Sequence, residues 1–546
     1  MIKRIFKTLG VLTFFGTSLV SLYLVNLFYM KPASIDHYLA KEVITDLVDS
    51  PEAMTYMGVF DGLNWLTNHN ARLSIPKSDD LKKDIQGTRK KLEILNKYSN
   101  ESLKSSQRIT KKIAIFDTEN QLNQLELFPY HDYPLNQVRG EHHNIISFMS
   151  DMHPVRNLSE AEDFIKRTDL AIEVYSGLYD WLQRQADSGI YAPKFVYAHI
   201  IEQLSELINY SHEEHPLYTQ FIKKIKLLDL SDEEFNSLES SIKNSIQKSV
   251  TPGFVLLRDF MLETEKNANP HHGIWSQPNG DEFYKLRIRS YTTTDYSPER
   301  IHQMGLSEVA RISKRMKEIL VSLGYDSNKT VGVLMNELNE DPSMLYADTP
   351  DRKEIVVQDY MDMVNEATEG IKEYFHSMPK APVIVKAVPE YSEQTAPGGY
   401  YQAPALDGSR PGVFYANLYD IKQTPKYSMK TLTFHEATPG HHHQIAHSLE
   451  NEELTLYRRF GYRTSAFSEG WALYSEQLSL EAGLAPDPYD ELGILQSEIF
   501  RAVRLVVDTG IHYKKWTREE AIDYMKAKTG MSDTECRVEI ERYIVW

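Results

Sequence analysis

The chain has 546 residues, with 60 Lys and Arg against 77 Asp and Glu, which gives a formal net charge of −17. Hydrophobic residues make up 41% of it, and Gly and Pro number only 26 and 24, so disordered, collagen-like and low-complexity chains are excluded. The acidic balance argues against a nucleic-acid partner, because phosphate binding needs a basic face. The single Cys, Cys536, excludes a disulfide framework and a cysteine-based metal cluster.

The N-terminus carries a basic cluster followed by an apolar stretch. Residues 3–7 (KRIFK) hold three basic side chains, residues 8–30 hold no charged one, and Lys31 follows. Roughly 20 apolar helical residues span a bilayer core of ~30 Å. We therefore predict an uncleaved signal anchor over residues 1–31, in the inner membrane, with the remainder periplasmic or extracellular because the basic cluster stays inside. The alternative is a long cleaved signal peptide, which exports the same remainder.

Helical periodicity dominates residues 35–266. Apolar residues recur there at three- and four-residue spacing, which predicts helices throughout. Two helix starts carry predicted capping boxes, Ser159 with Glu162 and Ser231 with Glu234. No linker rich in Pro, Gly or Ser follows, so we expect a helical wall and not an independent module.

The character of the sequence changes near Pro270. A Pro-Asn-Gly turn is followed by alternating residues from Phe283 to Arg289, which predicts a strand. A helix is predicted next from Ser297 to about Leu323, with Pro298 in its first turn.

A second β-like region spans residues 381–418, and helical periodicity returns from residue 427 to the end. Capping boxes are predicted there at Thr517 with Glu520 and at Ser532 with Glu535. The expected fold is mostly α, with a small β-sheet embedded in a large helical domain.

Five of the 19 His lie between residues 435 and 447, in a run that begins His435-Glu436-Ala437-Thr438-Pro439-Gly440-His441. In the motif H-E-x-x-H, two His one turn apart bind Zn²⁺ and the Glu acts as general base. His435 and His441 are six residues apart, so a regular helix would turn about 600° between them and place them on opposite sides. Because proline breaks the helix ladder and glycine tolerates unusual dihedral angles, a local bulge can bring His441 to the second ligand position.

Two other pairings of these histidines are possible. His442 is seven residues after His435 and on the same helix face, but ~10.5 Å away along an undistorted helix. One zinc ion does not bridge that distance at Zn–N bonds of ~2 Å. His443 and His447 form a helical pair four residues apart, which is a weaker alternative.

A second motif, Ser468-Glu469-Gly470-Trp471-Ala472-Leu473-Tyr474-Ser475-Glu476, supplies carboxylates. Zincins with a Glu as third ligand take it from a second helix, and Glu469 lies 28 residues after His441, enough for a returning antiparallel helix. Glu476 is two turns further along the same face. We interpret Glu469 as a ligand and Glu476 as the residue that orients a ligating His.

These motifs, together with RAVRLVVDTGIHYKKWTREEAIDYM, resemble the domain-of-unknown-function 885 family of bacterial proteins. The resemblance covers residues 35–546 and is strongest over 398–546. Members look like zinc peptidases related to the gluzincins and to the largely helical oligopeptidase fold. The resemblance implies one zincin-like catalytic domain over residues 32–546, with zinc at the floor of a cleft and an edge strand facing the substrate. The chain ends at Trp546, before a segment resembling P-G-Q-A-x-x-Y-K that members usually carry, so a truncated C-terminus is expected.

The resemblance implies that His435, His441 and Glu469 are zinc ligands and that Glu436 is the general base. It also draws attention to the helix that contains Arg501, Arg504, Asp508, His512 and Tyr513. We expect His442, if it is not a ligand, to support the ligands together with Glu476.

Further roles follow from the proposed chemistry. The oxyanion that develops during peptide hydrolysis needs a donor besides zinc, and His512, Tyr513 and Tyr415 are the candidates. Arg501 and Arg504 are expected to bind a substrate carboxylate, although Arg504 has Asp508 four residues away as an alternative partner.

The expected function is a zinc metallopeptidase that cleaves peptides by metal-activated water with a Glu general base. Two alternatives stay open. One is a zinc hydrolase of a non-peptide amide or ester. The other is a membrane-tethered, catalytically inactive metal- or peptide-binding protein. The sequence contains no G-x-S-x-G elbow, which argues against a serine hydrolase. It contains no P-loop, which argues against a nucleotide-binding protein.

Overall fold

The computed structural model forms two compact units. Unit 1 comprises the chain up to Pro270 and Thr455–Tyr457, and unit 2 comprises His271–Leu454 and Arg458–Ile544. The structure describes residues 21, 23–27, 30, 32–58, 60–77, 79–138, 140–388, 393, 397–404 and 410–545. That residues 32–546 act as a single catalytic domain stays a prediction.

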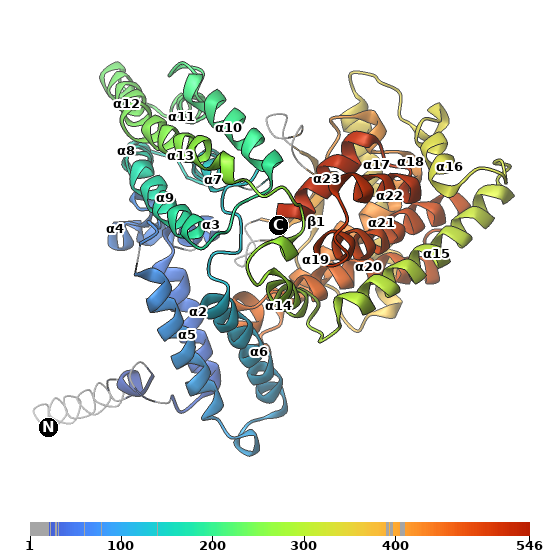
Figure 1. The fold of residues 1–546 in the computed structure, drawn as a ribbon, viewed down its shortest axis with the longest axis horizontal. Coiled ribbons are helices and arrows are strands. Elements are labelled where there is room, and N and C mark those ends of the chain that lie inside the picture. Colours follow the sequence, from blue (N-terminus) through green and yellow to red (C-terminus); the bar gives the residue numbers. More distant parts are fainter. Residues whose placement is uncertain are drawn as a thin grey trace, which may run out of the picture. The chain divides into compact units, whose positions relative to one another are not determined.

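Unit 1 is helical, as its periodicity predicts (Figure 1). Its α-helices are α2 (Ile35–Asp49), α3 (Pro51–Met57), α4 (Asn64–Thr67), α5 (Asp80–Asn96), α6 (Ser105–Leu127), α7 (Glu141–Asp151), α8 (Leu158–Asp169), α9 (Ala171–Asp187), α10 (Lys194–Asn209), α11 (Pro216–Ile225), α12 (Asp232–Ser245) and α13 (Thr251–Thr264).

The two capping boxes predicted in unit 1 differ in outcome. Ser231 and Glu234 cap α12 reciprocally, which confirms that prediction. The box at Ser159 is wrong, because α8 begins at Leu158 and its N-cap is Asn157. The Asn157 side chain accepts a hydrogen bond from the Glu160 backbone and fills the cap position first, which leaves Ser159 inside the first turn.

The predicted signal anchor over residues 1–31 lies mostly outside the described residues and stays a prediction. Among the residues that the structure does describe, no helix is both long and apolar enough to cross a bilayer.

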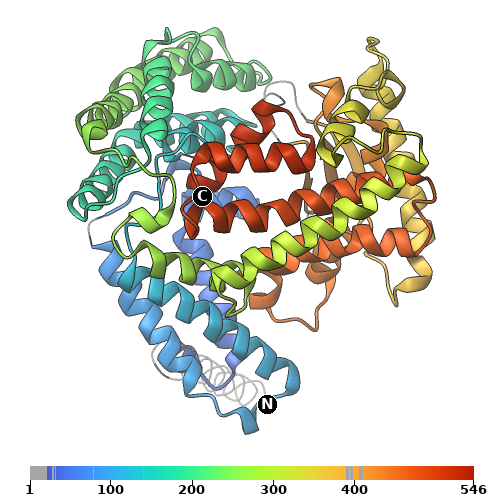
Figure 2. The ribbon, with the colours of Figure 1, turned by 45° about the vertical axis from the view of Figure 1, so that its right-hand side comes forward.

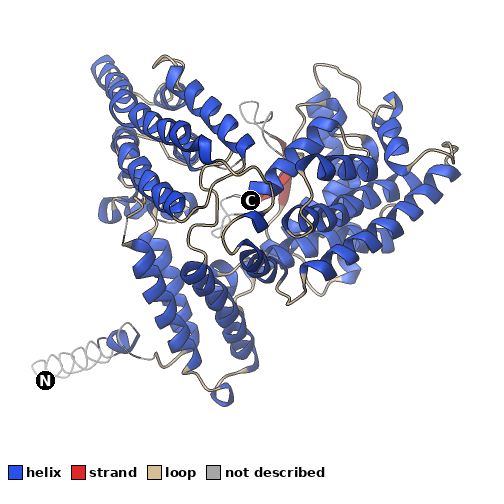
Figure 3. Cartoon of the chain, in the orientation of Figure 1, coloured by secondary structure: helices blue, strands red, loops and turns tan. Residues whose placement is uncertain are grey.

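Unit 2 combines helices with a small sheet (Figure 3). Its strands are β1 (Val383–Ala387), β2 (Gly399–Gln402) and β3 (Gly412–Ala416). Its α-helices are α14 (Gly280–Thr292), α15 (Pro298–Ser322), α16 (Val331–Asn339), α17 (Arg352–Ile371), α18 (Lys426–Glu436), α19 (His441–Glu450), α20 (Ser465–Glu481), α21 (Pro488–His512), α22 (Arg518–Thr529) and α23 (Asp533–Val545).

The strand predicted from Phe283 to Arg289 is wrong, because these residues lie inside α14. Phe283, Tyr284 and Ile288 are buried in it, and their spacing suits one face of a helix better than one face of a strand. Asn279 takes a left-handed conformation just before the helix, so the turn signal starts a helix and not a hairpin.

Other predictions for unit 2 are confirmed. Ser297 caps α15, whose first residue is Pro298. Thr517 and Glu520 cap α22 reciprocally, and Ser532 exchanges hydrogen bonds with Glu535 before α23.

The three strands form one sheet in the order β1-β3-β2, within the predicted region. β1 pairs with β3 in parallel and β2 pairs with β3 antiparallel, so β2 is an edge strand. The face that carries Val385 and Phe414 packs on Tyr360 of α17 and on Met429 of α18. This core fixes α18, which carries the first histidine of the motif, against the sheet.

Helix α21 is the central support of unit 2. It lies alongside α15 over a long interface (Figure 2) and also contacts α18, α20 and α22. At Gly493 an added Cβ would lie 2.2 Å from the Tyr427 carbonyl oxygen, so α18 and α21 approach closely there. The histidine motif and the Glu469 motif are thereby held against one common helix.

Candidate metal centre

The histidine motif folds as two helices with a break between them. α18 ends at Glu436 and α19 begins at His441, so the predicted bulge inside one helix is instead a full interruption. A Cβ on Gly440 would lie 1.9 Å from the His435 carbonyl oxygen and 2.3 Å from that of Phe434. Only glycine lets the chain fold back this tightly onto the end of α18.

Two hydrogen bonds from α20 secure the break. The Trp471 indole Nε1 donates to the Pro439 carbonyl at 2.8 Å. The Ser475 hydroxyl donates to the Phe434 carbonyl at 2.9 Å, one of the orphan carbonyls at the end of α18. Sequence reasoning assigned no role to either residue, although both lie within the Glu469 motif.

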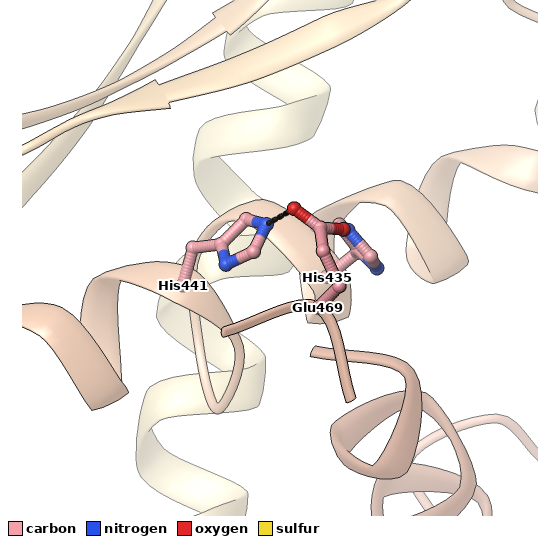
Figure 4. A group of neighbouring side chains, drawn as sticks. All are labelled: His435, His441 and Glu469. Carbon is pink, nitrogen blue, oxygen red and sulfur yellow. Dashed lines mark ion pairs between the residues drawn. The ribbon is translucent and has the colours of Figure 1, made fainter. Parts of the chain in front are cut away.

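The break brings His435, His441 and Glu469 together (Figure 4). The His435 Nε2 atom lies 3.6 Å from Glu469 Oε2, and His441 Nε2 lies 3.7 Å from Glu469 Oε1. The two imidazole rings meet edge to face, with centroids 4.8 Å apart. Across the described residues, this is the one group of three or more His, Cys, Asp or Glu with ligand atoms close enough for a metal ion.

The spacing of these ligand atoms fits zinc. Ligands ~2.0–2.1 Å from a tetrahedral ion are ~3.3 Å from one another, close to the two distances found here. Two imidazole nitrogens and one carboxylate are also the donor set of zinc sites that keep a position for water. The Glu469 side chain is 57% exposed, so the site is open to solvent on that side.

Glu476 contacts His435 on the Nδ1 side of the ring, away from the other two candidate ligands. It is fully buried, and its Oε1 atom lies 2.7 Å from His435 Nδ1. This hydrogen bond fixes the imidazole tautomer and directs Nε2 to the other two ligands. The same Oε1 accepts a hydrogen bond from the Ser497 hydroxyl of α21 at 3.0 Å, a contact that sequence reasoning missed because a lone Ser in a helix carries no signal.

Arg501 lies against the ring of His435. Its Nη2 atom is 3.2 Å from both ring nitrogens and 4.0 Å from Glu476 Oε1, while its Nη1 donates to Ser497. The structure therefore places a cation beside the first histidine, and the role of Arg501 in binding a substrate stays a prediction.

The charges of the group are coupled. Burial would lower the pKa of His435, but the neighbouring carboxylates of Glu469 and Glu476 raise it to about 9. The His435 imidazole beside it lowers the pKa of Glu469 to about 2. Burial, followed by the charge of His435, lowers the pKa of His441 to about 4, which favours its neutral, metal-binding form.

Glu436 is a buried carboxyl group at the end of α18. Among the described residues, its Oε2 atom has no hydrogen-bond partner, and burial raises its pKa to about 7. A carboxyl group with a pKa near neutrality can both accept and return a proton at physiological pH.

The other histidines of the run point elsewhere. His442 contacts Tyr401 Oη through Nδ1 and the Ala381 carbonyl through Nε2, both at 3.0 Å, so it joins α19 to the sheet. A Cβ on Gly412 would lie 2.6 Å from this ring. His443 packs on Phe375 and stacks with His447. The structure thus places His441, and not His442, beside His435.

His512 and Tyr513 do not meet this group. The His512 Nδ1 accepts from the Ile274 backbone, and Nε2 contacts the Tyr543 carbonyl, each at 3.0 Å. His512 is 11 residues after Arg501 on α21, ~16 Å along the axis at 1.5 Å per residue. Both nitrogens of His512 are thus engaged by backbone groups, which does not suit an oxyanion donor. Tyr513 is the C-cap of α21, and its role as an oxyanion donor stays a prediction.

Arg504 and Tyr415 also have structural partners. Arg504 Nε donates to Tyr543 Oη at 2.6 Å, and Nη2 lies 3.3 Å from Glu539, so it ties α21 to α23. Its alternative pairing with Asp508 is wrong, because that carboxylate accepts from Tyr284 Oη instead. Tyr415, on β3, stacks on Tyr400 of β2.

Replacing Gly440 with Ala should lower the free energy of unfolding by about 1–3 kcal/mol, because the new Cβ overlaps the His435 carbonyl oxygen. Gly470→Ala is the matched control, since a Cβ there meets nothing within 4 Å and alanine gains up to about 1 kcal/mol in a helix. Thermal unfolding of both full chains by circular dichroism makes the comparison, and an unchanged Gly440→Ala curve contradicts the steric argument.

Most of the chain resembles known proteins. Residues 51–546 match the family described as "Bacterial protein of unknown function (DUF885)". A crystal structure from Colwellia psychrerythraea, described as a "putative lipoprotein", matches with a TM-score of 0.84 and 32% identity over 93% of this chain and 89% of that one. A second such structure, from Shewanella oneidensis, shares the fold alone, with a TM-score of 0.70 and 16% identity over 94% of this chain and 90% of that one. No curated protein matches. The family match over nearly the entire length shows that the chain belongs to the DUF885 family of bacterial proteins.

Proposed function

We propose that this protein is a zinc-dependent hydrolase, and that its substrates are peptides. The observation that carries the proposal is the meeting of His435 Nε2, His441 Nε2 and the Glu469 carboxylate, next to a buried Glu436. A Glu directly after the first histidine ligand is the arrangement of the H-E-x-x-H peptidases, interrupted here by two extra residues. The resemblance to zinc peptidases in the same motifs supports the choice of a peptide bond.

Each residue of the group has a distinct part in the proposed reaction. His435, His441 and Glu469 hold the ion, and Glu476 keeps His435 in its ligating tautomer. Bound zinc polarises a carbonyl and acidifies a water molecule. Glu436 takes a proton from the attacking water and returns it to the leaving amine, for which its raised pKa is suited.

Arg501 is the residue that we assign to substrate anion binding. Its guanidinium lies beside His435 and is partly exposed, so it can reach a substrate carboxylate or a carbonyl oxygen that gains charge. Arg504 has no such part, because its donors are engaged by Tyr543 and Glu539.

The purified full chain should bind one zinc ion, and His441→Ala should weaken binding by at least ~10-fold, because one of three protein ligands is lost. His442→Ala is the matched control and should retain the metal, since His442 faces Tyr401 and Ala381. Mass-spectrometric metal analysis after chelation and reloading distinguishes them. Equal loss of zinc in both variants contradicts the assigned ligand set.

Glu436→Gln should leave zinc content unchanged and reduce peptide hydrolysis by about 10²–10⁴-fold, because glutamine cannot accept the proton. Cleavage of a mixed peptide library, read by mass spectrometry with and without chelator, is the measurement. The control is Glu481→Gln, an exposed residue of the same helix as Glu469. Zinc binding with no chelator-sensitive cleavage in the wild type would favour a binding protein, and cleavage of amides or esters alone would favour a different hydrolase.

A further inference from the structure

Unit 1 exposes large apolar side chains between the end of α3 and the short helix α4, both labelled in Figure 1. We name the described residues 56–58 and 60–66, which run from the last two residues of α3 through a 3₁₀ turn into α4, the apolar loop. Its most exposed members are Tyr56 at 65%, Trp65 at 80% and Leu66 at 67%. Met57 and Leu63 are exposed as well. Single exposed apolar residues are ordinary on a protein surface, whereas five of them within residues 56–66 indicate a candidate contact surface.

Buried hydrogen bonds hold both ends of the apolar loop. The Asn64 side chain accepts from the Asn70 backbone at 3.0 Å, and Thr55 Oγ1 donates to Asn70 Oδ1 at 2.9 Å. Arg167, which is fully buried, donates from Nη2 to Thr55 Oγ1 at 3.0 Å and to the His69 carbonyl at 2.7 Å. Trp65 therefore directly follows an anchored Asn64, within the short helix α4.

The apolar loop presents no net positive charge. Residues 51–67 contain no Lys or Arg, and their two acidic groups are occupied inside unit 1. Asp61 pairs with Arg156 at 2.8 Å, and Glu52 accepts hydrogen bonds from Ser74. An uncharged surface of Trp, Tyr and Leu suits the boundary between lipid headgroups and acyl chains, where Trp and Tyr are enriched. It does not suit recognition of anionic lipids, which requires Lys and Arg clusters.

The position of the loop in the chain indicates its partner. The uncharged stretch 8–30, which is long enough to span a bilayer, ends four residues before α2. α2 has 15 residues, ~22 Å, and Ser50 alone separates it from α3, whose last two residues begin the apolar loop. The exposed Ile44 and Val48 lie on the second half of α2.

We propose that the apolar loop inserts into the interface of the lipid bilayer in which residues 8–30 are predicted to sit. Burial of Tyr56, Trp65 and Leu66 among the acyl-chain ends drives the insertion, and the anchored base presents these side chains without further ordering. Unit 1 then has a second membrane contact, which restricts its tumbling about the predicted anchor. This inference does not depend on the chemistry of the metal centre.

Fluorescence quenching by lipids tests the insertion. The full chain is placed in nanodiscs of palmitoyl-oleoyl phosphatidylcholine, with and without bromine on the acyl chains, and compared with Trp65→Phe. The difference between the two proteins isolates the emission of Trp65, which should fall at least twofold in brominated bilayers. Phenylalanine keeps the side chain apolar, so the variant retains the contact and removes only the reporter.

A matched pair of leucine variants separates insertion from general adhesion. Leu66→Ser should at least halve the quenching of Trp65, whereas Leu227→Ser should leave it unchanged, since Leu227 is 86% exposed but lies between α11 and α12. Trp65 emission that is equal in both bilayers overturns the proposal, as does a chain that neither enters nanodiscs nor sediments with phosphatidylcholine vesicles. Unquenched Trp65 with a dimer that Leu66→Ser dissociates assigns the loop to a second copy of the chain instead.

Discussion

The contact between Gly440 and the carbonyl oxygens at the end of α18 is the constraint on which the candidate metal centre depends. Two histidines six residues apart cannot share a face of one helix, since they are separated by about 600° of rotation. The break removes that restriction by starting a new helix at His441. The fold-back places the second ring edge to face with His435 and turns the next residue, His442, to the sheet. Gly440, which has no side chain, thus determines that His441 lies beside His435.

Glu469 and Glu476 of α20 have different chemical roles because they lie at different depths in the protein. Glu469 is largely exposed, whereas Glu476, two turns later on the same face, is fully buried. A buried carboxylate is costly unless hydrogen bonds satisfy it, and Glu476 has His435 and the Ser497 hydroxyl as partners. Because those partners come from α18 and α21, the bonding of Glu476 holds three helices in one arrangement, with His435 between the two carboxylates.

The elements that sequence reasoning predicted correctly are those that local signals dictate. Ser231 with Glu234 and Thr517 with Glu520 start helices where predicted, because each capping box satisfies its own backbone donors. The strand predicted at Phe283 failed since alternation over a few residues also occurs on an amphipathic helix, and the burial of neighbouring Phe283 and Tyr284 decided between them. His512 shows the same limit of sequence reasoning for a candidate site residue. Its neighbourhood on α21 suggested catalysis, but its two nitrogens are bonded to backbone groups far away in sequence.

By itself, the sequence determined a mostly helical chain with a small sheet, a distortion of the helix at Pro439 and Gly440, and the three candidate ligands. These follow from periodicity, from the backbone properties of two residue types and from motif spacing, all of which act over a few residues. The tertiary structure alone decided that His442 and Arg504 serve packing, and that Ser475, Ser497 and Trp471 support the centre. The reason is physical: a side chain with several possible partners is assigned only when distant helices pack and bury some of those partners beside it. A sequence motif identifies which chemical groups are present, and tertiary packing determines which of them come into contact.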